Sequence, residues 1–325
     1  MKVSRRKLIV SSGLSASLGV LSTQVSAQAF PTRPIKIVVN FAAGGTSDVM
    51  ARALARSMST TLGQQVVIEN RTGALGAVGA AAVARSAPDG YTVLLTTQGS
   101  LTEIPVISPQ TPYDPLTAFV PITLVGESPF VLFAHPDFPA NNVRELVQYA
   151  KAQPNGVDIS VTGSSVKLCT YALQGAAGIK LVHIPYGGTG PAVNAAIAGH
   201  TKLSLNTVTS AMLENVKAGK LKFLGVGTPK PYRLLPGVAP IGDTLPGYTA
   251  TVWWAVFAPG GTPPDIVARL NRAFKQALAD PANEEIFTSN AVLALESTPE
   301  ELGRRVTEGI ATTRKLVSAY NIPTE

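Results

Sequence analysis

A repeated order of strand, glycine-rich loop and helix is the feature that most constrains how this chain can fold. Pro34–Asn40 predicts a strand, Phe41–Ser47 a loop and Asp48–Leu62 a helix. Short β-branched runs continue to alternate with longer helical patterns along the chain, which is typical of α/β proteins with mostly parallel strands. The predicted fold class is therefore α/β.

The remaining predicted elements follow the same alternation. Further strands are predicted at Val66–Glu69, Tyr91–Thr96, Ile122–Val125, Val131–Ala134, Asp158–Val161, Leu181–Ile184, Lys202–Leu205, Leu221–Val226 and Trp253–Ala258. Further helices are predicted at Val143–Ala152, Pro191–Gly199, Pro263–Leu278, Asn283–Thr288 and Pro299–Tyr320, with two more that end near Gly178 and Gly219.

The N-terminus has the order of segments that an export signal requires. Met1–Lys7 is basic, Leu8–Val20 is apolar, and Val25–Ala27 provides the small residues of a cleavage site. The apolar stretch is well short of the roughly 20 residues that a spanning helix needs. We therefore predict a signal peptide at residues 1–27 and export to the periplasm. Arg5 and Arg6 resemble a twin-arginine signal, and the ordinary secretory route stays open.

Proline and glycine cluster at Pro105–Pro121 and at Pro229–Gly247. Such turn-rich stretches can mark the places where a chain crosses between two domains. Two crossings would make the first domain discontinuous and complete it with the C-terminal helices. The alternative is a single large domain with long surface loops, although a chain of 325 residues favours two domains.

Charge and composition exclude several classes of function. The precursor has 27 basic residues against 20 acidic ones, and four of the basic residues lie in the signal, which leaves a charge of about +3. No basic block remains to track phosphates, so we expect no nucleic-acid partner. The single cysteine, Cys169, allows no intramolecular disulfide, and His135, His183 and His200 lie too far apart in the sequence to suggest a metal site. We expect no metal and no cofactor.

The loop Phe41–Asp48 is the first candidate binding element. Gly44 and Gly45 allow a tight turn with exposed amides, and Thr46, Ser47 or Asp48 can serve as the helix N-cap. A helix N-terminus at the carboxyl end of a parallel strand offers free N–H donors and a partial positive charge, and therefore suits an anion. The alternative is a tight turn that binds nothing.

Two further loops follow the same plan. Tyr186–Pro191 contains paired glycines before a predicted helix, and Thr162–Ser165 opens another helix with hydroxyl groups. The only basic residue near these three loops is Lys167. The pattern predicts a small carboxylate held by backbone amides, hydroxyl groups and water instead of an arginine clamp.

These segments resemble the substrate-binding proteins of tripartite tricarboxylate transporters, the Bug family of periplasmic receptors. The resemblance spans the mature chain and rests on Pro34–Val39 with Gly44, Gly45 and Asp48, on Val67–Arg71 with Gly73 and Gly76, and on Pro88–Thr92, His183–Gly188 with Pro191 and Ala192, Ala218–Leu221 and Ala258–Pro263. It implies a type II periplasmic-binding-protein fold, in which two α/β domains close on a ligand in the cleft between them.

The resemblance implies domain boundaries, partners and site residues. Domain 1 is expected at 28–128 and 253–325, and domain 2 at 129–252. The protein would be a monomer that passes a mono- or dicarboxylate, aliphatic or aromatic, to membrane transporter subunits. The expected ligand-binding residues are Phe41, Ala43, Gly44, Gly45, Thr46, Ser47, Gly99, Ser100, Thr162, Gly163, Ser164, Ser165, Tyr186, Gly188, Thr189, Gly190 and Asn206.

The chain departs from the family pattern in two places. Ser164–Lys167 replaces a second glycine, a serine and a histidine in the third loop, and Asn206 stands where the family commonly has aspartate. Ser164 and Lys167 also fit the Ser-x-x-Lys spacing of acyl-transfer enzymes, so a serine hydrolase is the rival hypothesis. A sensory receptor that signals to a membrane kinase is a third.

Overall fold

The computed structural model describes residues 30–324, and within them ten strands form one continuous sheet. The strand order is β2-β1-β3-β9-β4-β7-β5-β6, and β8 and β10 each pair with β4. The strands are β1 Ile35–Val39, β2 Val66–Asn70, β3 Thr92–Thr97, β4 Phe119–Ala134, β5 Val157–Val161, β6 Leu181–Pro185, β7 Leu203–Thr207, β8 Lys222–Val226, β9 Thr251–Pro259 and β10 Leu293–Ala294. The predicted signal peptide lies outside the described residues.

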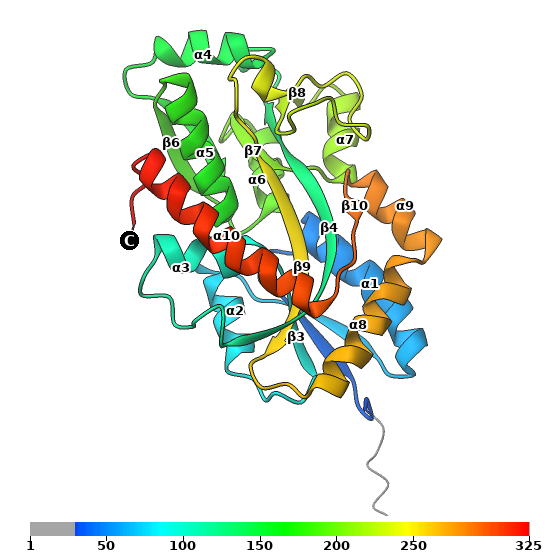
Figure 1. Cartoon of the computed structure of the whole chain (residues 1–325). Coiled ribbons are helices and arrows are strands. Elements are labelled where there is room, and N and C mark those ends of the chain that lie inside the picture. Colours follow the sequence, from blue (N-terminus) through cyan, green and yellow to red (C-terminus); the bar gives the residue numbers. More distant parts are fainter. Residues whose placement is uncertain (1–29, 325) are drawn as a thin grey trace, which may run out of the picture.

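Helices cover this sheet along its length (Figure 1). The α-helices are α1 Thr46–Leu62, α2 Ala77–Ala84, α3 Ile104–Ile107, α4 Val143–Lys151, α5 Ser164–Ala177, α6 Thr189–Ile197, α7 Ser210–Lys217, α8 Pro264–Leu278, α9 Pro281–Ser289 and α10 Pro299–Ala319. Short 3-10 turns lie at η1 Ala74–Gly76 and η3 Ile241–Asp243, and η2 Gly99–Glu103 is a π-helical turn. Among the described residues, no helix is both long enough and apolar enough to cross a membrane.

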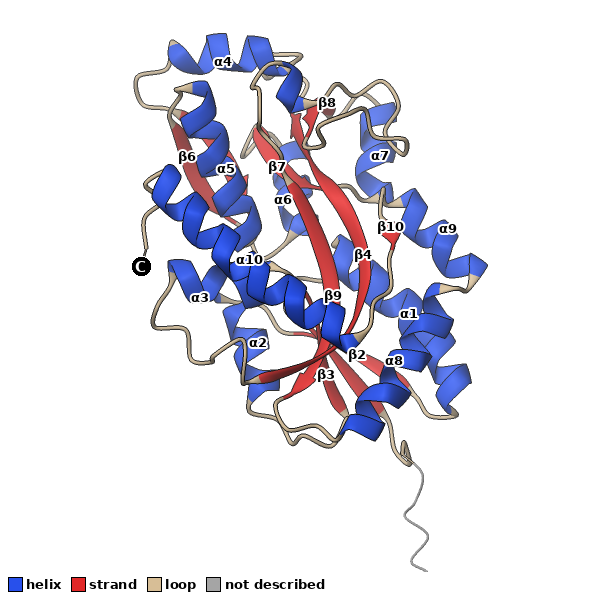
Figure 2. Ribbon diagram, in the orientation of Figure 1, coloured by secondary structure: helices blue, strands red, loops and turns tan. Residues whose placement is uncertain are grey.

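The strands separate into two groups of parallel neighbours joined by longer antiparallel ones. β1 pairs in parallel with β2 and β3, while β5 pairs in parallel with β6 and β7. β9 and β4 run side by side between the two groups (Figure 2). This arrangement brings the carboxyl ends of both parallel groups toward the middle of the molecule, where the loops that follow them meet.

Strand β4 corrects one prediction. Ile122–Val125 and Val131–Ala134 were expected as two strands, but a single strand of 16 residues contains both. Its first part pairs with β9 as far as Pro129, and from Phe130 onward it pairs with β7. Gly126 and Pro129 interrupt the β-branched pattern in the sequence, yet pairing with β9 continues through a bulge next to Gly126.

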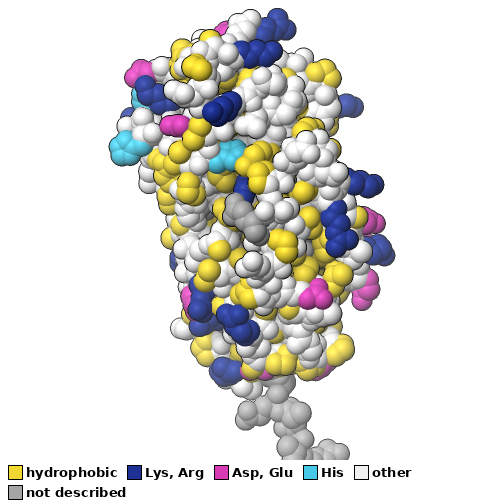
Figure 3. Space-filling model, turned by 90° about the vertical axis from the view of Figure 1, so that its left-hand side faces the viewer, with side chains coloured by type: hydrophobic (Ala, Val, Ile, Leu, Met, Phe, Trp, Pro, Cys, Tyr) yellow, Lys and Arg dark blue, Asp and Glu magenta, His cyan; other side chains and the backbone are white. Residues whose placement is uncertain are grey.

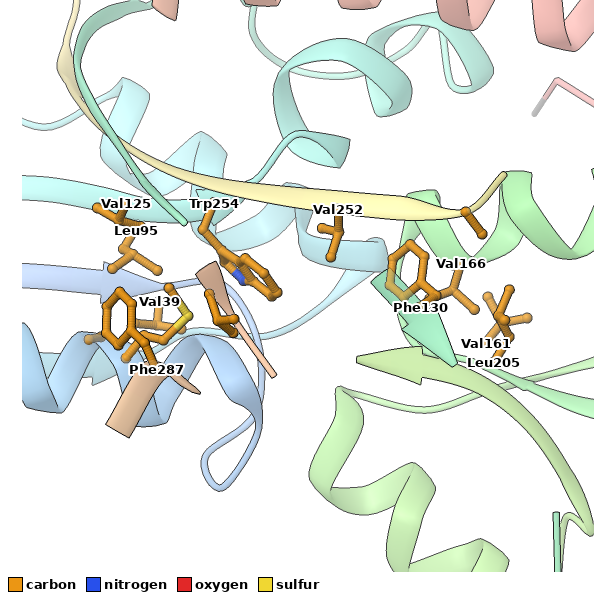
Figure 4. Packing of buried hydrophobic residues seen from close by; sticks show 14 of the residues in the cluster. Val39, Leu95, Val125, Phe130, Val161, Val166, Leu205, Val252, Trp254 and Phe287 are labelled. Atoms are coloured by element: carbon orange, nitrogen blue, oxygen red, sulfur yellow. The ribbon is translucent and has the colours of Figure 1, made fainter. Parts of the chain in front are cut away.

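The hydrophobic core is continuous from one group of strands to the other. Its largest cluster includes Leu54 on α1, Trp254 on β9, Leu132 on β4 and Leu173 on α5. Figure 4 shows this packing around Trp254 and Val252, which point to the same side of β9. The outer surface is mixed in character, and on the face in Figure 3 the Lys and Arg side chains lie among uncharged and acidic ones.

Candidate functional site

One pocket opens where the loops after β1, β5 and β6 meet β4 and β9. About 430 Å³ of space lies between its lining atoms, and part of that space is open solvent. It is lined by Phe41, Gly45, Thr46, Ser47, Thr97, Phe130, Thr162, Gly163, Ser165, Val166, Thr189, Asn206, Thr207, Val252 and Trp254. Within residues 30–324, none of the side chains in this lining is charged.

Three helices begin at this pocket, and each has a glycine as its N-cap. Gly45 precedes α1, Gly163 precedes α5 and Gly188 precedes α6, and no side chain caps any of the three. The N-caps of α4, α7, α9 and α10 each carry a capping side chain, while α2, α3 and α8 also begin without one. The first amides of a helix have no acceptor within the helix, so those of α1, α5 and α6 are donors for another group.

These glycine caps correct two predicted helix starts. α1 begins at Thr46, not at Asp48, and α6 begins at Thr189, not at Pro191. The threonines therefore lie in the first turns of their helices instead of capping them. Asp48 acts from inside α1, where its carboxylate accepts a hydrogen bond from the Gly44 amide at 3.1 Å. That bond fixes Gly44 in a left-handed conformation, with φ of 79°.

The charge of Asp48 is neutralised locally. Arg52 Nε donates to Asp48 Oδ2 at 3.0 Å, one helical turn away. Burial would raise the pKa of Asp48, but hydrogen bonds from Arg52, Gly44 and Asn70 outweigh burial and lower it below its ordinary value. Asp48 is therefore an ionised, paired residue that shapes the first loop.

A chain of hydroxyl groups crosses the floor of the pocket. Thr46 Oγ1 lies 2.8 Å from Thr207 Oγ1, which in turn lies 3.0 Å from Thr189 Oγ1. Thr189 donates to Asn206 Oδ1 at 3.0 Å, and Thr162 donates to the same oxygen at 2.9 Å. Asn206 is 1% exposed. The bonds join α1 to α6 and to the ends of β5 and β7.

The first and second loops also touch directly. The Ala42 amide donates to Gly187 O at 3.0 Å. A Cβ added at Gly188 would lie 3.1 Å from the Ala42 nitrogen, and one at Gly190 would lie 3.2 Å from the Ala43 carbonyl oxygen. A side chain at either position would therefore push the two loops apart by a few tenths of an ångström.

One wall of the pocket is apolar. Trp254 and Val252 on β9, Phe130 on β4 and Val166 on α5 follow one another along it (Figure 4), and Phe41 from the first loop completes it. Trp254 is only 1% exposed, and its indole N–H donates to Ser47 Oγ at 2.8 Å. This bond ties the apolar wall to the first turn of α1.

A buried carboxyl group lies behind the start of α5. Glu103, at the end of η2, is 4% exposed and accepts a hydrogen bond from Ser165 Oγ at 2.7 Å. Gln98 donates to its other oxygen at 3.2 Å. Burial raises the pKa of Glu103, while hydrogen bonds from Ser165, Ser164 and Gln98 act in the opposite direction.

The structure brings about half of the expected site residues to the pocket lining. Those that line it are Phe41, Gly45, Thr46, Ser47, Thr162, Gly163, Ser165, Thr189 and Asn206. Gly188, Gly190, Ala43 and Gly44 lie at the contact between the first two loops.

Four expected residues lie behind the pocket or beside it. Ser100 is buried and hydrogen-bonded to Asn40, and Gly99 packs so closely on Ser164 that a Cβ would collide with the serine hydroxyl. Ser164 is itself buried, next to Glu103. Tyr186 lines an adjoining pocket, and its hydroxyl lies 2.7 Å from Thr201 Oγ1.

The residues expected from the sequence do not include six lining residues and the carboxyl group behind them, although the pair Trp253 and Trp254 suggests either an aromatic wall for a ligand or burial in a strand. These six lining residues are Thr97, Phe130, Val166, Thr207, Val252 and Trp254. Thr97 and Thr207 are the last residues of β3 and β7. The predicted loops were found because they follow the carboxyl ends of strands, and the same rule could have found these two threonines. The four apolar residues are indistinguishable in sequence from core residues. Glu103 belongs to no motif.

The fold and the pocket together define a class of protein. Two groups of parallel strands, joined by crossing strands around a pocket rich in helix N-termini, are the architecture of a solute-binding protein with the periplasmic-binding-protein fold. The solved structure of the periplasmic binding protein BugD shares it: the TM-score is 0.86 and the identity 34%, covering 91% of this chain and 100% of BugD. The predicted fold class is confirmed.

The chain belongs to the tripartite tricarboxylate transporter receptor family, whose model matches residues 50–322. It is 34% identical to protein BugT of Bordetella pertussis over 91% of each chain. MatC from Rhodopseudomonas palustris, solved with bound malate, is 30% identical with a TM-score of 0.84, covering 89% of this chain and 100% of MatC. Members of the family are solute-binding receptors and not enzymes, which sets aside the hydrolase hypothesis for Ser164 and Lys167.

Proposed function

We propose that this protein is exported to the periplasm, captures a small carboxylate-containing organic acid in the pocket and delivers it to a membrane transporter of the tripartite tricarboxylate type. One observation carries the proposal: the uncapped N-termini of α1 and α6 face a pocket whose lining contains no charged side chain. Helix N-termini hold anions through free N–H groups and through the positive end of the helix dipole.

The hydroxyl groups favour a carboxylate over a larger anion. Thr46 and Thr189 lie in the first turns of the two helices and share Thr207 as a hydrogen-bond partner. A group held between these turns must be small and must accept hydrogen bonds from more than one side. A carboxylate has two acceptor oxygens and meets both conditions. The bound malate of MatC supports the same class of ligand for this chain.

We further propose that the domains are residues 28–128 with 253–325, and residues 129–252, and that they close around the ligand. Support comes from β4, whose pairing partner changes from β9 to β7 between Pro129 and Phe130. The contact of Ala42 with Gly187 then belongs to the closed form, because the two loops come from different domains. The protein would act as a monomer, which size-exclusion chromatography with light scattering can check.

A thermal-shift screen tests the proposed function. Ligand-stripped protein is mixed with mono- and dicarboxylates, aliphatic and aromatic, and each acid is matched with its uncharged primary amide as a control of equal size. At least one acid should raise Tm by mass action, while its amide leaves Tm unchanged. At a ligand concentration of a hundred times Kd, binding adds about 2.7 kcal/mol to the free energy of unfolding. No shift with any acid, or equal shifts with acid and amide, would refute the proposal.

A further inference from the structure

The third helix N-terminus at the pocket differs from the other two because the protein supplies its own carboxyl group there. Glu103 Oε2 accepts from Ser165 Oγ, and the Ser164 hydroxyl also bonds to the Glu103 carboxyl. Both serines lie in the first turn of α5. By contrast, the only carboxylate in the first turn of α1 is Asp48, which is paired with Arg52, and the first turn of α6 contains no acidic residue.

Glu103 is fixed in this position by its surroundings. It ends the π-helical turn η2, where Gly99 allows close packing against Ser164 and Ser165. Gln98, which precedes that turn, donates to the second oxygen of Glu103. The carboxyl group is therefore held by hydrogen bonds on both oxygens and is almost inaccessible to solvent. An anion that approached the start of α5 would meet this group directly behind Ser165.

The rest of the pocket has little to offer to a second charge. Beyond the hydroxyl chain, the lining has five apolar side chains, Phe41, Phe130, Val166, Val252 and Trp254, and three further hydroxyl groups, those of Ser47, Thr97 and Ser165. The Ser165 hydroxyl already donates to Glu103. The indole N–H of Trp254 is already used by Ser47. A carboxylate pressed against this wall would lose its hydration without gaining donors, which is strongly unfavourable. An apolar group in the same place would gain free energy from burial.

We propose that the pocket selects acids with a single carboxylate and an apolar body, and that Glu103 occupies the position where a dicarboxylate would place its second charge. The ligand carboxylate lies at the N-termini of α1 and α6, and its hydrocarbon or aromatic body lies against Trp254, Val252 and Phe130. The inference rests on the proposed function and narrows the ligand class within it.

Matched pairs of acids test this inference by isothermal titration calorimetry with ligand-stripped protein. Hexanoate is compared with adipate, which has the same number of carbons, and benzoate with terephthalate. We expect the monocarboxylate of at least one pair to bind about tenfold more tightly than its diacid, because the second charge would be desolvated beside Glu103. Tighter binding of the diacid in both pairs, or equal binding, would overturn the inference and leave the proposed function standing. If no acid of the thermal-shift screen binds either, the proposed function itself fails.

Two isosteric variants separate the two parts of the argument. Glu103→Gln replaces the buried carboxyl group by an amide of the same size, so the preference for monocarboxylates should shrink by about threefold or more. Val252→Thr places a polar group on the apolar wall, so affinity for the monocarboxylate should fall while affinity for the diacid stays level or rises. Circular dichroism confirms that each variant is folded. If both variants fold and the ratio of monocarboxylate to dicarboxylate affinity is unchanged in both, Glu103 and the apolar wall do not select the ligand. A merely structural role would alter stability but not this ratio.

Discussion

Gly188 offers a direct test of the contact between the first two loops. A Cβ at this position would lie 3.1 Å from the Ala42 nitrogen and 3.4 Å from Ala42 Cβ. Its φ of 161° is an extended conformation that alanine adopts without strain. Gly188→Ala therefore acts through the space between the loops and not through the backbone at residue 188.

The expected loss of affinity follows from how closely the added methyl group would approach Ala42. Favourable contacts between carbon atoms lie at about 3.5–4.0 Å, so the loops must separate by several tenths of an ångström. Adding a methyl group to a well-packed contact costs about 1–3 kcal/mol, and every 1.4 kcal/mol is about a tenfold change in Kd. If the ligand binds the closed form, Gly188→Ala should weaken binding by roughly 5- to 140-fold.

The neighbouring glycine supplies a matched control. A Cβ at Gly187 would lie 3.9 Å from Ala42 Cβ, which is an ordinary contact. Gly187→Ala should therefore bind the same acid with nearly unchanged Kd. Both variants are titrated calorimetrically with the acid that gives the largest thermal shift, after their folding is confirmed by circular dichroism. Equal affinities of the two folded variants would refute the idea that this loop contact belongs to the ligand-binding form.

Three further predictions concern buried polar groups. Trp254→Phe removes the donor to Ser47 and should lower the free energy of unfolding in urea by about 1–3 kcal/mol, and no loss would contradict a structural role for that bond. Asn206→Asp keeps an acceptor oxygen but adds a negative charge, so calorimetric titration at pH 8 should show weaker carboxylate binding that partly recovers at pH 5. Equal affinity of this variant at the two pH values would contradict the prediction. Because burial raises the pKa of Glu103 above its ordinary 4.5, the folded state holds the proton more tightly, and the contribution of Glu103 to stability falls as pH rises through the raised pKa. The stability of Glu103→Gln relative to the native chain should therefore increase over that window in urea unfolding, and a pH-independent difference would contradict the shift.

The loops of the site could be predicted because their chemistry is local. Glycine pairs such as Gly44–Gly45 and Gly187–Gly188 follow β-branched runs, and small polar residues after them can only be helix starts or turns. The exact helix starts could not be predicted. Either glycine or threonine can be an N-cap, and the choice of Gly45 and Gly188 is decided by the close approach of the two loops in space.

The apolar wall could not be predicted because it depends on tertiary structure. Val252 and Trp254 look like core residues in a strand, and both are in fact almost fully buried. They line a pocket only because β9 crosses between the two groups of strands at this point. Glu103 is a similar case, since an acidic residue in an apolar stretch carries no signal of the serine hydroxyls that meet it across 62 positions of sequence.

The direction of the hydroxyl chain determines which groups can hold the ligand. Thr162 and Thr189 both give their protons to Asn206 Oδ1. With its own proton used, Thr189 can only accept from Thr207. Thr46 Oγ1 also donates to the Val208 carbonyl oxygen at 3.1 Å, so its one proton is divided between that oxygen and Thr207. Each hydroxyl has one proton, so the part of the chain from Thr207 through Thr189 runs in one direction and ends at the amide oxygen of Asn206.

A carboxylate can only accept hydrogen bonds, so it competes with Asn206 for those protons. If it takes a proton from Thr189, the bond to Asn206 is lost, and the net gain is small because one good acceptor replaces another. The backbone amides at the N-termini of α1 and α6 carry no such cost, since no acceptor within the helix satisfies them. The amides must therefore supply most of the binding free energy, while the threonines fix the distance between the two helices. Removing the Thr189 hydroxyl should consequently weaken binding less than separating the loops at Gly188.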